Sequence, residues 1–62
     1  MAIVKAKDLK VGMELDTGAM VVTVIIIDAD LVELELQVYD PDCGEVDFLS
    51  FQENAEETYN IN

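Results

Sequence analysis

The chain has 62 residues, of which fourteen are acidic, three are lysines and none is histidine, for a formal net charge of −11 at pH 7. The three lysines and one acid lie in the first ten residues, so residues 11–62 carry thirteen carboxylates and no basic side chain. Direct binding to nucleic acid or to an anionic membrane surface is excluded, because both need clustered basic side chains. We expect one small domain that buries about 60% of its unfolded surface and binds a basic protein.

Cysteine usage and hydropathy bear on the compartment. Cys43 is the lone cysteine, which leaves neither an internal disulfide nor a cysteine-based zinc site. The first ten residues lack the apolar segment of a signal peptide, and the apolar run at residues 21–27 is far too short to span a bilayer. The sequence therefore predicts a cytoplasmic protein.

The first third of the chain reads as short strands and turns. Residues 3–7 are extended, with Lys5 and Lys7 on one face, as expected of an edge strand. Residues 8–12 form a turn that ends at Gly12, and residues 13–15 form a second short strand. A hairpin turn follows, with Gly18 at its end.

Two central strands follow, and they determine the expected core. Residues 20–27 are aliphatic and rich in β-branched side chains, which favours a strand. A three-residue turn at 28–30 leads to residues 31–39, where aliphatic and polar side chains alternate with period two. The turn sets the pairs Ile27 with Leu31, Val24 with Leu34, and Val22 with Leu36. The inner face then consists of Met20, Val22, Val24 and Ile26 against Val38, Leu36, Leu34 and Val32.

The last third begins with a dense turn signal at residues 40–44, which include Pro41 and Gly44. A strand at residues 45–51 follows, and pairing across a five-residue loop places Tyr39 opposite Glu45 and Leu36 opposite Phe48. Residues 53–62 are polar and acidic, and we expect a flexible tail, disordered or with one helical turn. The predicted domain therefore spans residues 1–52.

Short strands separated by turn signals every eight to twelve residues are typical of a small antiparallel barrel or sandwich. For a chain of this length, we predict an all-β fold, an SH3-like barrel of four to five strands. Barrel closure hides strand edges, and it gives the long strand at residues 20–27 room to bend across both halves.

Four segments resemble a known barrel: residues 8–13, which end in Gly12 and Met13, residues 16–18, residues 21–24, and residues 44–46 leading to Phe51. Together they resemble the N-terminal SH3-like, KOW-type barrel of the elongation factor P and initiation factor 5A family, over roughly residues 3–52. The resemblance implies the fold. That family carries a functional lysine in a loop whose position is held here by Asp28, Ala29 and Asp30, so the resemblance argues against a translation-factor activity.

Catalytic and metal-binding residues are poorly represented. Cys43 lies between Asp42 and Glu45, which raise the pKa of a thiol rather than activate it. Asp40, Asp42 and Asp47 resemble a calcium loop faintly, but glycine comes fifth instead of sixth, and a hairpin turn explains these residues without a cation. We predict a protein that is not an enzyme and has no cofactor and no metal.

The outer face of the central sheet is the predicted partner-binding site. The expected register places Ile25, Glu33 and Phe51 in one row, and Thr23, Glu35 and Leu49 in the next. This mixture of apolar anchors and carboxylates resembles a protein interface. An alternative is that the apolar ends of these strands bend into a second part of the core. The predicted partner-binding residues are Ile25, Glu33, Glu35, Asp47, Leu49 and Phe51.

Three functional hypotheses follow from these observations. The first is a non-catalytic, acidic interaction module that binds a basic partner protein. The second is a narrower version, a viral, phage-type inhibitor that acts as a nucleic-acid mimic, with carboxylate rows in the basic groove of a nucleic-acid-binding protein. The alternative is a structural subunit that forms a homo-oligomer through its apolar sheet face.

Overall fold

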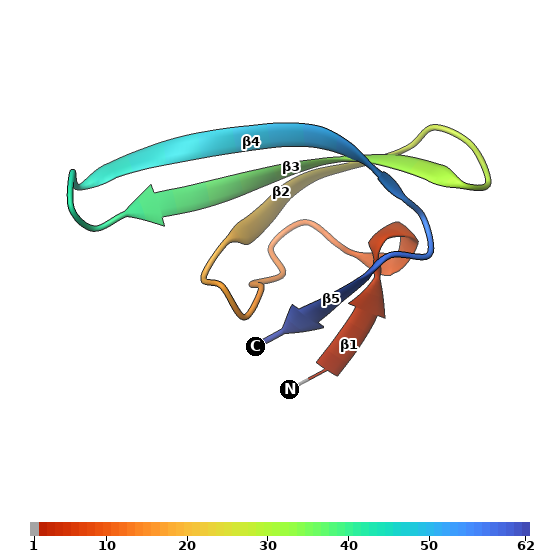
Figure 1. Cartoon of the computed structure of the whole chain (residues 1–62), viewed down its shortest axis with the longest axis horizontal. Helices are drawn as coiled ribbons and strands as arrows, with labels where there is room; N and C mark the ends of the chain where they lie inside the picture. Colours follow the sequence, from red (N-terminus) through yellow and green to blue (C-terminus); the bar gives the residue numbers. More distant parts are fainter. Residues whose placement is uncertain (1) are drawn as a thin grey trace.

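The computed structural model describes residues 2–62 and shows an all-β fold, as predicted (Figure 1). Strands β2, β3 and β4 form one antiparallel sheet in that order, and β1 pairs with β5 in a second antiparallel sheet. The elements are β1 (Ala2–Lys5), a 3-10 helix (Ala6–Asp8), β2 (Met20–Ile26), β3 (Leu31–Asp40), β4 (Glu45–Asn54) and β5 (Thr58–Ile61).

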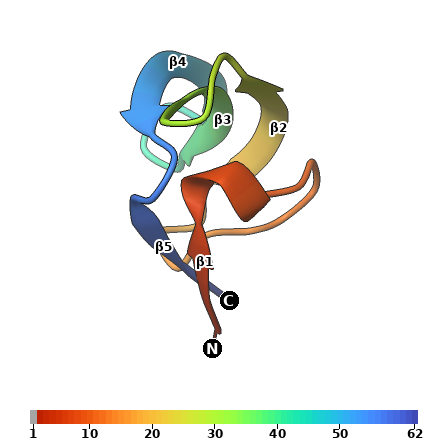
Figure 2. The same cartoon turned by 90° about the vertical axis from the view of Figure 1, so that its right-hand side faces the viewer.

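The two sheets face one another but do not close into the predicted barrel. Figure 2 shows the curled three-stranded sheet on one side and the β1–β5 pair on the other. The segment predicted as a strand at residues 13–15 makes only isolated bridges, from Glu14 to Met20 and from Leu15 to Ile61. Turns bound this segment on both sides, with positive φ at Gly12 and Gly18, so it is too short to join the sheets in one continuous ladder.

The core lies between the two sheets. The prediction that the aliphatic side chains of β3 point inward is confirmed, because Val32, Leu34 and Leu36 alternate with the less buried Glu33 and Glu35. The buried residues are Ala6, Leu9, Leu15, Ala19, Val21, Val32, Leu34, Leu36 and Ala55.

The predicted register between β2 and β3 is right at one end and wrong at the other. Val24 lies opposite Leu34, as expected, but Leu36 lies opposite Val21 rather than Val22. A β-bulge between Val21 and Thr23 inserts one extra residue, which reverses the alternation of side chains before it. Val21 is therefore fully buried, whereas Met20, which the sequence places in the core, is 39% exposed.

The predicted register between β3 and β4 is wrong by one residue along its whole length. The loop has four residues rather than five, because Asp40 and Glu45 already pair. The Asp40 carboxylate accepts a hydrogen bond from the Asp42 amide (3.0 Å), and the Asp40 carbonyl accepts one from the Gly44 amide (2.8 Å). Gly44 permits this tight turn with a φ of +69°. Every side chain of β4 consequently lies on the opposite face from the one predicted.

The prediction of an acidic tail that is disordered or one helical turn is wrong. β4 continues past residue 52 to Asn54, and β5 pairs with β1 along four residues. Ala55 is buried, and Tyr59 and Ile61 pack against the core. These three apolar side chains, spaced among the acids, give the segment enough burial to order it, so the fold crosses the predicted boundary between residues 52 and 53 without a break.

Candidate interaction surface

The six residues predicted to bind a partner lie on two different faces of the three-stranded sheet. Directly opposite residues on paired strands share a face, and the observed pairs separate the set. Ile25, Glu33 and Glu35 lie on the outer face, defined as the face turned away from β1 and β5 (Figure 1). Asp47, Leu49 and Phe51 lie on the inner face, in line with Val38, Leu36 and Leu34.

The predicted rows across β3 and β4 are corrected accordingly. Glu33 lies opposite Gln52 rather than Phe51, and Glu35 lies opposite Ser50 rather than Leu49. The four-residue loop is the physical cause, because a one-residue slip exchanges the two faces of a strand. The outer face of β4 is thus uncharged from residue 46 to residue 54, and its carboxylates lie on the inner face.

Three apolar residues of the outer face are absent from the partner-binding set predicted from the sequence. Tyr39 and Phe48 are each 59% exposed and Val46 is 43% exposed, although all three lie within regular strands. Tyr39 lies opposite Val46, and Phe48 lies opposite Gln37, so the three form one apolar patch at the hairpin end of the sheet. The ability of Asp40 to close an Asx turn was the sequence signal for a four-residue loop, and that loop sets the register that places Val46 and Phe48 on the outer face.

The charged part of the outer face lies next to this patch. Glu33 and Glu35 are half-buried on β3, and Ile25, which lies opposite Glu33, is 48% exposed. The Thr23 hydroxyl donates a hydrogen bond to Oε1 of Glu35 at 3.2 Å. Over residues 2–62, all ion pairs in the structure involve a different acid, Glu56, so the outer-face carboxylates have no cationic partner there.

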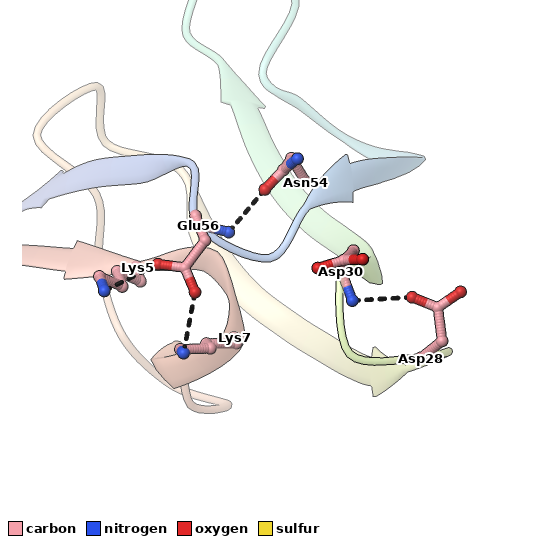
Figure 3. A network of polar contacts seen from close by, with 6 residues as sticks. All are labelled: Lys5, Lys7, Asp28, Asp30, Asn54 and Glu56. Carbon is pink, nitrogen blue, oxygen red and sulfur yellow. Dashed lines mark hydrogen bonds and ion pairs between the residues drawn. The ribbon is translucent and has the colours of Figure 1, made fainter.

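Two of the three lysines form ion pairs within the protein. The ammonium groups of Lys5 and Lys7 lie 2.7 Å and 3.0 Å from the two carboxylate oxygens of Glu56 (Figure 3). The Glu56 amide donates to the Asn54 side chain at 2.8 Å, which fixes the turn that carries it. Hydrogen bonds from Lys5 and Lys7 lower the pKa of Glu56 to about 2. This cluster ties the N-terminal strand to the β4–β5 turn and engages Lys5 and Lys7 away from the outer-face carboxylates.

The described residues show no built centre for catalysis or metal binding. Within residues 2–62, no pocket is present, and no three acidic, cysteine or histidine side chains converge as cation ligands. The Asp40 carboxylate is engaged in the hairpin turn, and Cys43 is exposed at its tip. Over the same residues, the structure contains no helix of the length and apolarity needed to cross a membrane.

The outer face therefore offers two kinds of contact, carboxylates without a cationic partner among residues 2–62 and exposed aromatic and aliphatic side chains. Apolar anchors beside polar groups are typical of the surfaces through which proteins bind one another. Comparison of the chain with protein-family models, with curated proteins and with solved structures found no match in any of the three.

Proposed function

We propose that this protein is a non-catalytic, acidic interaction module that binds a basic partner protein through the outer face of its three-stranded sheet. The observation that supports this proposal most directly is the exposure of Tyr39 and Phe48 beside the half-buried Glu33 and Glu35, on a face that neither β1 nor β5 covers.

The apolar patch supplies the contact energy in this proposal. Exposed aromatic side chains on a rigid strand lose little conformational freedom on binding, and aromatic residues dominate the energetics of many interfaces. Phe48 and Tyr39 are held by the β3–β4 ladder rather than by a loop, so their positions are set before the partner arrives. The carboxylates of the same face then select a partner with basic side chains.

The net charge of −11 supports a basic partner more than a neutral one. Opposite charge accelerates encounter, and its range follows the Debye length, which is about 30 Å at 0.01 M salt and about 10 Å at 0.1 M. Partner affinity is therefore expected to fall as salt is added. We place this function in the cytoplasm, where the exposed thiol of Cys43 stays reduced.

The test is affinity capture with matched baits. The wild-type protein, the Glu33→Lys/Glu35→Lys variant and the control Asp16→Lys/Glu57→Lys are immobilised, and the captured basic protein is identified and its dissociation constant measured. Both variants raise the net charge by four, and the two control residues are exposed acids outside the sheet. We expect the outer-face variant to lose binding and the control to retain most of it. Equal binding by all three baits contradicts the proposal.

The nucleic-acid mimic is a narrower form of the same proposal. Glu33 and Glu35 are two residues apart on β3 and share a face, which spaces their backbones by about 7 Å and forms a short row of negative charges. The corrected register removes Asp47 from this face, so the mimicry rests on a shorter row of carboxylates. As a phage-type inhibitor, the protein competes with DNA or RNA for its partner, and a competition titration tests this.

The homo-oligomer is the alternative that the exposed aromatic residues favour. Light scattering distinguishes it, because an apolar self-interface gives a mass several times 6.9 kDa that changes little with salt. A monomer with salt-dependent partner binding supports the interaction module instead. We also propose that the resemblance to the elongation factor P barrel concerns the fold alone, since Asp28 accepts a hydrogen bond from the Asp30 amide (2.8 Å) in a plain Asx turn.

A further inference from the structure

Strand β4 is an open edge of the three-stranded sheet. β3 is its partner on one side, and within residues 2–62 no other strand pairs with it. In an antiparallel strand at an edge, alternate residues direct their backbone N–H and C=O groups away from the sheet. Every second residue of β4 thus presents backbone donors and acceptors along one side, up to Asn54, whose amide donates to the Glu53 carboxylate and whose carbonyl accepts from the Glu57 amide.

The other edge of the same sheet, strand β2, is protected over its first residues. The Val21 carbonyl accepts a hydrogen bond from the Gly12 amide (2.8 Å), and the Val21 amide donates to the Met13 carbonyl (2.9 Å). The bulge beside Val21 shortens the regular part of this edge to four residues, 23–26, against ten in β4. β4 has neither device, because its ladder with β3 is regular, and its sequence contains no proline and no lysine.

The side chains beside the open edge are apolar and acidic. On the outer face, Val46 and Phe48 are followed by the small Ser50. On the inner face, the exposed Asp47 and the 53% exposed Leu49 flank the same edge. An incoming strand therefore meets backbone groups, apolar side chains and a carboxylate within six residues.

A second copy of this chain fits this edge poorly. Each copy carries a net charge of −11, and like charges placed opposite one another destabilise a strand pair. In one register, centred on Leu49, antiparallel self-pairing also places Glu45 of one copy opposite Glu53 of the other. Charge complementarity instead favours an occupant with basic side chains.

We propose that the β4 edge binds an extended strand of the basic partner, which adds to the sheet as its fourth strand. This inference rests on the proposed function and specifies how the partner is held. Strand addition is a common mode of peptide recognition, in which backbone hydrogen bonds provide affinity and alternate side chains provide specificity.

The edge also defines the sequence pattern of the occupant opposite residues 46–51. Apolar side chains fit opposite Val46, Phe48, Leu49 and Phe51, and a basic one fits opposite Asp47. A second basic side chain fits opposite Ser50, because the small Ser50 leaves a path to Glu35, its cross-strand neighbour. The pattern is apolar, basic, apolar, apolar, basic, apolar, and it is the same for parallel and antiparallel addition.

A synthetic peptide tests this pattern. The probe is a capped decapeptide with two threonines at each end and valine and lysine in the pattern above, and the control has the same composition with both lysines moved to the ends. We expect the probe to bind with saturable shifts of β4 amide resonances and slower hydrogen exchange at alternate β4 amides. Binding of both peptides with equal affinity, or without protection of β4 amides, overturns the proposal.

Backbone methylation separates strand addition from simple charge attraction. Two versions of the probe are N-methylated on alternate amides, one at odd and one at even positions. The version whose methyl groups face β4 is expected to bind at least about tenfold more weakly, because several hydrogen bonds are lost. The other version is expected to bind like the unmodified probe. Equal affinity of the two versions rules out addition at the edge.

Protein variants complete the test and separate it from the proposed function. Asp47→Lys is expected to weaken the probe about two- to tenfold through a local charge reversal, whereas the control Glu57→Lys leaves its affinity unchanged. If a basic partner binds in a Glu33- and Glu35-dependent manner but leaves β4 amides unprotected, strand addition is wrong and the proposed function stands. A dimer of the free protein with protected β4 amides assigns the edge to a second copy and likewise overturns the basic occupant.

Discussion

The two halves of the β3–β4 hairpin have the same kind of sequence and very different surroundings. In the half beside the second sheet, Val32 and Leu34 are fully buried. In the half beside the hairpin loop, Leu49 lies on the same inner face and is 53% exposed. Both halves alternate apolar and polar side chains in regular strands. The comparison teaches that burial here is set by what covers the sheet and not by the strand pattern itself.

Strand length explains the difference. A strand advances about 3.3 Å per residue, so the four-residue strands β1 and β5 span about 13 Å, whereas the ten-residue strands β3 and β4 span about 33 Å. The second sheet therefore covers less than half of the first, and the hairpin projects beyond it (Figure 1). The long axis of the molecule, 38 Å, is set by this projection.

The largest expected effect comes from the half of the β3–β4 hairpin that lies beside the second sheet, here called the covered half. Leu34→Ala removes a fully buried side chain from the centre of β3, and it should cost about 2–5 kcal/mol in the free energy of unfolding. The matched control, Leu49→Ala, removes the same atoms from a residue that is 53% exposed, and it should stay within about 0.5 kcal/mol. Urea unfolding followed by circular dichroism measures both. Similar losses in the two variants would mean that the hairpin half is covered after all.

A second pair of variants tests the bulge that aligns the covered half. Val21 is fully buried and Val22 is only half-buried. Val21→Thr introduces a hydroxyl without a partner into the core, and it should cost about 1–3 kcal/mol in the free energy of unfolding. Val22→Thr should cost less, because its hydroxyl reaches solvent. A larger loss of stability in Val22→Thr than in Val21→Thr, in the same urea experiment, would indicate the register without a bulge.

These two residues also show what the sequence predicts and what it does not. The alternation of β3 identifies Val32, Leu34 and Leu36 as core, and the three-residue turn aligns Val24 with Leu34. Nothing in the aliphatic run of β2 marks the bulge, because Val21 and Val22 are chemically identical. Periodicity alone therefore places the register of β2 correctly only on the turn side of the bulge.

The candidate surface was less predictable than the core, for a physical reason. Its composition depends on the β3–β4 register, and one residue of loop length exchanges Phe48 for Leu49 on the outer face. Ile25, Glu33 and Glu35 were placed correctly because they depend on the other hairpin. The C-terminal strand was missed because Thr58, Asn60 and the adjacent acids give it a polar composition, and its order comes from pairing with β1.

The third prediction concerns the cluster that holds β1 beneath the covered half. Glu56 has a pKa of about 2 in the folded protein, from hydrogen bonds and charge interactions with Lys5 and Lys7, against an ordinary value of 4.5. A lowered pKa means that the pair stabilises the fold above about pH 4.5 and that this contribution is lost as the pH falls toward 2. We expect the unfolding midpoint of the wild type to fall more steeply in this window than that of Glu56→Gln.

The control for this prediction is Glu57→Gln, which removes the same charge from the neighbouring residue. Glu57 makes no ion pair among the residues that the structure describes. Its variant should keep the steep acid dependence of the wild type, measured by thermal unfolding between pH 2 and pH 6. An acid dependence that is the same in all three proteins would show that the two lysines do not hold Glu56 in solution.

The smallest expected effect compares the two ends of the inner row of β4. At the covered end, the Tyr59 hydroxyl donates to Oε2 of Glu53 at 3.4 Å, whereas Asp47 at the other end is exposed. Burial first, and then the charge of Glu53, raises the pKa of Tyr59 to about 12. In a Tyr39→Phe background, which leaves Tyr59 as the one tyrosine, Glu53→Gln should lower this pKa, measured by absorbance at alkaline pH. The pKa should remain above 10, because burial is the larger cause and persists in the variant.

The control is Asp47→Asn, which removes a charge from the same row and should leave the titration of Tyr59 unchanged. A pKa of Tyr59 that responds equally to both variants would mean that the two ends of β4 are equally open to solvent, and the contrast between the covered and the projecting half would then be lost.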